Sequence, residues 1–121
     1  DGDPSGVDDG FAAPMEYEKA LAEFEGDEAF LMEVLEGFIE NVTSQIVNIR
    51  RAISEGDAET VRQEAHAIKG GASNLAADEL SHIASKLENI GKSGSLEGGL
   101  DILERLKKAF CRLELFARNR A

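Results

Sequence analysis

Residues 31–53 read LMEVLEGFIENVTSQIVNIRRAI, and their apolar side chains recur every three or four positions. This spacing predicts a long amphipathic α-helix with one continuous apolar stripe. The stripe consists of Leu31, Leu35, Phe38, Val42, Ile46, Ile49 and Ile53. A helix of this kind buries its stripe only against other apolar surfaces, so the rest of the chain decides the architecture.

Three more apolar stripes of helical spacing follow the long one. They consist of Val61, Ala65, Ile68, Ala72 and Leu75, then Leu80, Ile83, Leu87 and Ile90, and finally Leu100, Leu103, Leu106, Phe110 and Leu113. A short helix is expected over about residues 17–24, followed by a break at which Asp27 caps the long helix. No segment alternates convincingly with period two, which is the strand pattern. The predicted fold class is therefore all-α: an antiparallel four-helix bundle with an additional short N-terminal helix.

The breaks between the stripes carry signals for helix ends. Gly56 is expected to end the long helix and Asp57 to cap the next one. Residues 91–95 combine glycine, serine and lysine and are expected to form a loop. Asp101 and Glu104 have the spacing of a capping box at the start of the last helix.

The chain has 121 residues and a formal net charge of −11. This length fits one domain. We expect residues 1–14, rich in Gly, Asp and Pro, to be a flexible tail or linker, and residues 15–121 to be the bundle domain. The acidic charge argues against nucleic acid and anionic membranes as partners. No apolar run is long enough to span a bilayer, so membrane insertion is not expected.

Cys111 is the single cysteine, so an internal disulfide is impossible. It stands among the apolar residues Ala109, Phe110 and Leu113 and is expected to be a small core residue. The alternative, a reactive thiol, has no motif nearby. One free cysteine and a polar start without a secretory signal favour the cytoplasm.

His66 is the most informative candidate for a functional site. It follows Ala65 of the apolar stripe, so it lies about 100° around the helix, at the edge of the buried face or in solvent. The residues three, four or seven positions away that share its face are Arg62, Gln63, Lys69, Gly70 and Ser73. Gly70 and Gly71 each cost about 1 kcal/mol relative to alanine in mid-helix. They leave room either for another molecule to approach the ring or for close packing of helices.

These residue types suit transfer of a phosphoryl group. An imidazole is a competent nucleophile near neutral pH when its attacking nitrogen is unprotonated. Lys69 would offset the negative charge of the phosphoryl group, and a polar acceptor on the next helix would hold the proton of the other ring nitrogen. The alternative is an ordinary surface histidine beside a solvated lysine.

Residues 65–77, AHAIKGGASNLAA, resemble the signature of histidine-containing phosphotransfer (HPt) domains. That signature is a histidine, any residue, an aliphatic residue, Lys-Gly and then small residues. The resemblance extends over about residues 17–116 and implies the same order of helices. One departure is Ala76, which stands where the pattern usually has the glycine that ends the histidine helix, so a different helix end is expected here.

The resemblance implies a role for each matching residue. His66 would take a phosphoryl group at Nε2 from a receiver-domain aspartate, and Lys69 would lie beside the phosphate. Gly70 and Gly71 would let the receiver dock, on a surface to which Arg62, Gln63 and Ser73 also belong. Glu88 on the next helix would hydrogen-bond the other ring nitrogen, although a shift in register would select Ala84 or Asn89 instead.

The expected function is that of a phosphohistidine carrier in a two-component phosphorelay, without kinase activity because no nucleotide-binding motif is present. Its partners would be response-regulator receiver domains, and it would be a free protein or part of a hybrid sensor kinase. It would need no cofactor of its own, since Mg²⁺ belongs to the receiver. Two alternatives stay open: the phosphorylated N-terminal domain of a chemotaxis-type histidine kinase, and a docking adaptor that is never phosphorylated.

His82 is the other histidine and is expected to be a surface residue outside the signature. No set of Cys, His and carboxylate residues has the spacing of metal ligands, so no metal site is predicted.

Overall fold

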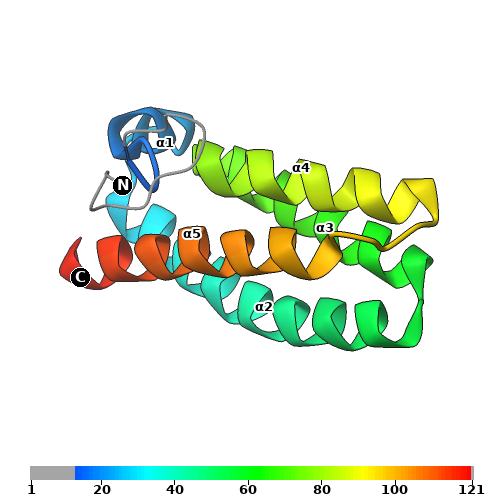
Figure 1. The fold of residues 1–121 in the computed structure, drawn as a ribbon. Helices are drawn as coiled ribbons and strands as arrows, with labels where there is room; N and C mark the ends of the chain where they lie inside the picture. Colours follow the sequence, from blue (N-terminus) through cyan, green and yellow to red (C-terminus); the bar gives the residue numbers. More distant parts are fainter. Residues whose placement is uncertain (1–12, 121) are drawn as a thin grey trace.

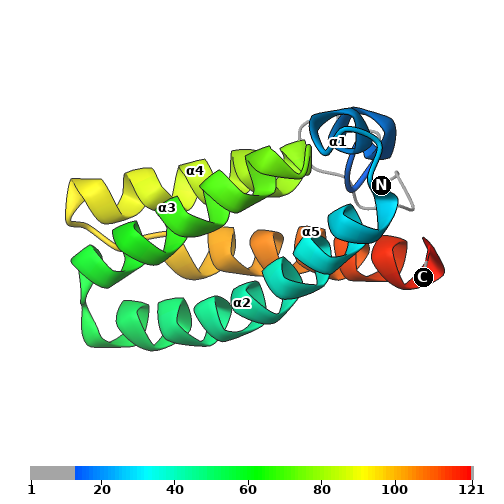
Figure 2. The ribbon, with the colours of Figure 1, turned by 180° about the vertical axis from the view of Figure 1, so that it is seen from behind.

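The structure is a computed structural model that describes residues 13–120. Its five helices are α1 (Tyr17–Glu23), α2 (Glu28–Glu55), α3 (Ala58–Asn74), α4 (Asp78–Ser93) and α5 (Gly99–Arg120). Helices α2 to α5 run along the length of the molecule, each antiparallel to the one before it, and α1 lies at the end where α4 begins and α5 ends (Figures 1 and 2). The predicted all-α bundle with a short N-terminal helix is confirmed.

The core lies between α2, α3, α4 and α5. Its fully buried large side chains on these helices and their ends are Leu31, Leu35, Ile49, Ile68, Leu75, Leu80, Ile83, Leu87, Leu103, Leu106 and Leu113. Each such side chain contributes about 1.5–3 kcal/mol relative to leaving it in water. Four members of the predicted stripes lie nearer the surface: Phe38, Ile53 and Ile90 are half-buried and Leu100 is exposed.

The predicted caps at both ends of α2 are present. Asp27 accepts a hydrogen bond from the backbone N–H of Phe30 at 3.0 Å. Gly56 takes the left-handed conformation at the end of α2, with a φ of 74°. Asp57 then caps α3 by accepting from the backbone N–H of Thr60 at 3.1 Å.

Three expectations near the C-terminal half of the chain were wrong. The loop predicted over residues 91–95 is shorter, because α4 continues to Ser93 and Gly91 is buried inside it. A Cβ on Gly91 would lie 2.6 Å from the backbone nitrogen of Arg62, so glycine is needed here for close packing of α3 and α4. The capping box at Asp101 is also absent, because α5 already begins at Gly99 and Glu104 pairs with Arg50 on α2.

The third correction concerns Cys111, which is exposed rather than part of the core. It follows the buried Phe110, and one residue of helix turns the side chain by about 100°, away from the core. Cys111 lines a groove of about 800 Å³ between α2 and α5.

The end of α3 keeps the geometry of a glycine cap although its residue is an alanine. Ala76 has a φ of 55°, in the left-handed region. The backbone N–H of Ala77 donates to the carbonyl of Ala72 at 2.9 Å, and that of Ala76 donates to Ser73 at 3.1 Å. The expected difference in the helix end is therefore one of strain and not of shape, since an alanine in this conformation costs roughly 1–2 kcal/mol.

The start of the described chain packs onto the same turn. Met15 is buried, and the backbone N–H of Glu16 donates to the carbonyl of Ala76 at 2.9 Å. Residues 1–12 of the predicted tail lie outside the described residues. The assignment of the bundle domain to residues 15–121 stays a prediction.

Candidate functional site

His66 lies on α3 with 63% of its side chain exposed. Its neighbour Ala65 is fully buried in the core. The structure therefore places the imidazole outside the apolar stripe of α3, as the phase of the helix predicts. Another molecule can reach the ring without any movement of the bundle.

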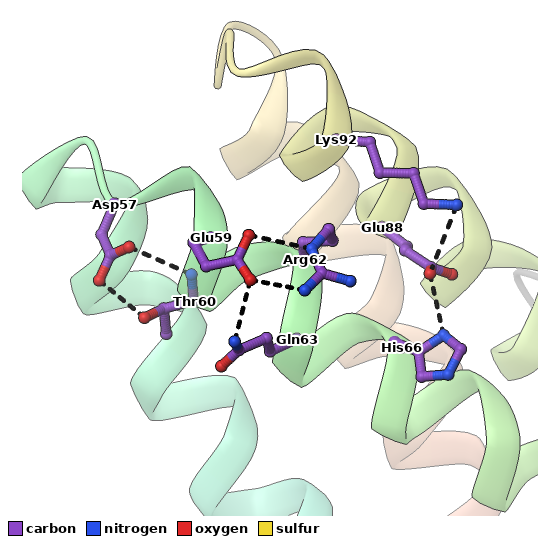
Figure 3. A network of polar contacts seen from close by, with 8 residues as sticks. All are labelled: Asp57, Glu59, Thr60, Arg62, Gln63, His66, Glu88 and Lys92. Atoms are coloured by element: carbon purple, nitrogen blue, oxygen red, sulfur yellow. Dashed lines mark hydrogen bonds and ion pairs between the residues drawn. The ribbon is translucent and has the colours of Figure 1, made fainter.

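Glu88 reaches the His66 ring from the neighbouring helix α4. Its Oε2 lies 2.9 Å from His66 Nδ1, and its side chain is only 4% exposed (Figure 3). Its other oxygen, Oε1, lies 2.9 Å from Lys69 Nζ. The packing of α3 on α4 thus selects Glu88 over Ala84, which is fully buried, and over Asn89, which is exposed.

The charge of Glu88 decides which nitrogen of His66 carries the hydrogen. The hydrogen bond from Lys69 lowers the pKa of Glu88 to about 2, with a further contribution from His66, although burial acts in the opposite direction. Glu88 is therefore an ionised carboxylate near neutral pH and can only accept hydrogen bonds. In the neutral ring the hydrogen consequently belongs on Nδ1 and the lone pair on Nε2, which points away from Glu88 (Figure 3).

Two lysines accompany this pair. Lys69 is on α3 and is 34% exposed, close enough to the surface to meet a group bound at the ring. Lys92 is on α4, with Nζ 3.7 Å from Glu88 Oε2. Lys92 was missed from the sequence, although its position four residues after Glu88 is a recognisable ion-pair spacing.

The two glycines beside the histidine have different surroundings. A Cβ on Gly70 would meet no atom within 4 Å, whereas a Cβ on Gly71 would lie 2.6 Å from a ring carbon of Phe38 on α2. Gly71 therefore lets the Phe38 ring pack closely against α3, which agrees with the close packing of helices that the sequence left open as one explanation. No contact among the described residues accounts for Gly70.

The other predicted docking residues lie on α3 on both sides of His66. Arg62 and Gln63 both hydrogen-bond to Glu59, through Arg62 Nε at 3.0 Å and Gln63 Nε2 at 2.9 Å (Figure 3). Ser73 is exposed, and its Oγ lies 2.8 Å from Ser81 Oγ on α4. These three side chains are held by neighbours in the bundle, and none has a described contact with the His66 ring. Their docking role stays a prediction.

His82 is exposed on α4, as expected. Within residues 13–120 no group of three or more His, Cys, Asp or Glu side chains is arranged to hold a metal ion. None of the helices in this described part of the chain is long and apolar enough to cross a membrane.

The fold and the site together define a class of protein: a small helical bundle that presents an exposed histidine on one helix and fixes it with a carboxylate from the next. The sequence matches the Hpt domain family over residues 33–115, most of the chain, and the chain belongs to this family. It is thus a histidine phosphotransfer domain, a class of phosphate carriers that work in phosphorelays.

A solved structure shares the whole fold. Histidine-containing phosphotransfer protein B (HptB) from Pseudomonas aeruginosa PAO1 matches with a TM-score of 0.83 over 91% of this chain and 96% of that chain. The two sequences are 23% identical. No match was found among the curated proteins.

Proposed function

We propose that His66 is the phosphorylated residue, which takes a phosphoryl group from a receiver-domain aspartate and passes it to another receiver. One observation carries this proposal: Nδ1 of His66 is held by the ionised Glu88 at 2.9 Å while the rest of the ring is exposed. In the neutral ring this arrangement leaves the lone pair on Nε2, where an incoming partner can reach it.

In the proposed reaction the lone pair of Nε2 attacks the phosphorus atom in line with the aspartyl oxygen. The Nε2–P bond forms, the P–O bond to aspartate breaks, and its electron pair leaves with the carboxylate. The ring gains a positive charge that is shared with Nδ1–H, where the Glu88 carboxylate stabilises it. Lys69 offsets the charge of the phosphoryl group, and the receiver contributes its Mg²⁺.

The docking surface proposed for the receiver lies on α3 around His66 and Gly70. Gly70 is exposed in mid-helix, where glycine costs about 1 kcal/mol relative to alanine. Since a Cβ there would meet no atom of residues 13–120 within 4 Å, we explain the glycine by the approach of a partner. Arg62, Gln63 and Ser73 would border the contact, and Gly71 would contribute a flat surface as well as room for Phe38.

The chain would act as a carrier in the cytoplasm, without a kinase activity or a cofactor of its own. It would serve receiver domains, either as a free protein or beside a hybrid sensor kinase. Its net charge of −11 makes nucleic acid an unsuitable partner.

The test is transfer from a panel of receiver domains charged with a small phosphodonor, followed by intact-mass measurement of this chain. We expect one phosphoryl group on the native protein, labile in acid and stable in base, and none on His66→Gln. His82→Gln is the matched control, because it removes the other exposed histidine and should be phosphorylated like the native chain. Phosphorylation of His66→Gln would contradict the assignment. Phosphorylation only by an ATP-binding kinase core would instead indicate a chemotaxis-type phosphodomain.

A further inference from the structure

A second cation stands beside Glu88 on the side away from Lys69. Lys92 belongs to the last turn of α4, is 57% exposed, and has its Nζ 3.7 Å from Glu88 Oε2. This separation is longer than a hydrogen bond. Within residues 13–120 the ion pair with Glu88 is the only one described for Lys92, so its long side chain is free to move toward the carboxylate.

The proposed function, on which this inference rests, makes two demands on Lys69. In the unphosphorylated protein Lys69 compensates the buried Glu88 at 2.9 Å. Once His66 carries a phosphoryl group with about two negative charges, Lys69 is also needed there. Any movement of Lys69 toward the phosphoryl group weakens its hold on Glu88, and a buried carboxylate that loses its counter-ion is unfavourable.

We propose that Lys92 is a positioning residue that takes over Glu88 when Lys69 turns to the phosphoryl group. Closing the 3.7 Å gap keeps Glu88 compensated and hydrogen-bonded to His66. The position of Lys92 suits this role, because a lysine four residues after a glutamate on one helix has the favourable order for an ion pair.

The other cation near the site is already committed elsewhere. Arg62 is held by Glu59, to which it donates from Nε at 3.0 Å and from a second guanidinium nitrogen (Figure 3). In the same view Lys92 extends toward Glu88, with which it forms the longer ion pair. With Lys69 and Lys92 both present, the unphosphorylated cluster has one negative and two positive side chains, which prepares it for the charge of the phosphoryl group.

The experiment measures how the phosphoryl group distributes at equilibrium between His66 and a receiver domain that the transfer assay has found active. We expect Lys92→Gln to shift this ratio toward the receiver by about three- to tenfold. Lys92→Arg keeps the positive charge and should restore the native ratio. Lys108→Gln on α5 is the matched control: it removes the same charge from an exposed site elsewhere and should leave the ratio unchanged.

A double-mutant cycle tests whether Lys92 acts through Glu88. In a Glu88→Gln background the substitution Lys92→Gln should cause no further shift, because no carboxylate is left to compensate. Equal shifts with Lys92→Gln and Lys108→Gln would overturn the inference, as would an undiminished effect of Lys92→Gln in the Glu88→Gln background. Failure of the native chain to accept phosphate from any receiver and from phosphoramidate is a different result, which overturns the proposed function and this inference with it. The midpoint of urea unfolding should stay close to the native value in Lys92→Gln, because Lys92 is exposed with its Nζ 3.7 Å from Glu88, while Lys69 still pairs with the buried carboxylate at 2.9 Å.

Discussion

Glu88 is an ionised side chain that the bundle buries almost completely, with 4% exposed. Its charge is maintained by partners from both helices of the site, chiefly Lys69 on α3. Because these contacts exist without a partner protein, the orientation of His66 is set during folding. A docking receiver would therefore meet a histidine that is already aligned.

The contacts of Glu88 predict how stability depends on pH. The pKa of Glu88 is lowered from 4.5 to about 2, so between these values the unfolded chain binds more protons than the folded protein. The contribution of Glu88 is thus present above about pH 5 and is lost as the pH falls toward about 2. We expect the difference in free energy of unfolding between the native protein and Glu88→Gln to shrink over this window, as measured by urea unfolding at a series of pH values.

Glu40 offers a control for that measurement, because it is exposed on α2 and has no ion pair among the described residues. Glu40→Gln should follow the native protein at every pH. A constant difference between the native protein and Glu88→Gln down to about pH 2 would show that the folded state does not depend on the charge of Glu88.

At the scale of the helix, α3 contains two adjacent glycines that serve different surfaces. Gly70 faces open space, and Gly71 faces Phe38 on α2. An alanine gains about the same helix propensity at either position, about 1 kcal/mol. Any difference in stability between the two substitutions therefore reports the surroundings of each glycine.

We expect Gly70→Ala to raise the free energy of unfolding by about 1 kcal/mol. Gly71→Ala should be less stable than Gly70→Ala by about 1–3 kcal/mol, because its Cβ overpacks against Phe38. Urea unfolding of both variants measures this difference. Gly70→Ala should nevertheless slow transfer from a receiver domain, since its methyl group would occupy the proposed contact. A Gly70→Ala variant that is more stable and transfers at the native rate would contradict the docking role.

The helices themselves were predictable because their signals are local. Apolar spacing located the stripe that includes Leu31 and Leu35, and the caps at Asp27 and Asp57 followed from side chains that bind the nearest backbone N–H groups. The exposure of His66 followed equally from its position beside Ala65. These features depend on one helix at a time.

Features that depend on the distance between two helices were harder to predict. Gly91 was predicted to lie in a loop because glycine, serine and lysine follow it in the sequence. The structure shows another reason for the glycine: the backbone of Arg62 comes too close to leave room for a side chain. The pairing of Glu88 with His66 required the register between α3 and α4, for which the sequence offered three candidates. Lys92 could be recognised as part of the site only after the structure had placed Glu88 beside His66.

At the scale of the molecule, α1 joins elements that are far apart in the sequence. Tyr17 on α1 donates a hydrogen bond to Glu28 at the start of α2, and the guanidinium of Arg120 on α5 stacks over the Tyr17 ring at 3.8 Å. Met15 and Ala20 are buried in the common core. This end of the bundle is therefore held together through the short helix.

The stability of two shortened chains should show where the predicted tail ends and the folded domain begins. A chain that begins at residue 13 should unfold at the native temperature, because it keeps every described core residue, of which Met15 comes first. A chain that begins at residue 25 lacks Met15, Tyr17 and Ala20 and should lose more than about 3 kcal/mol of stability. Thermal unfolding followed by circular dichroism compares them. Equal melting temperatures for the two shortened chains would show that α1 is not part of the cooperative unit.

The exposure of the His66 side chain, 63%, also bears on how long a message can be kept. A ring that is open to a docking partner is equally open to water, and nothing in the described structure closes over it. In the proposed role the phosphoryl group would leak away by hydrolysis whenever no receiver arrives to collect it. Such a carrier would stay phosphorylated only while its donor is active, and it would return to the unphosphorylated state without a separate phosphatase.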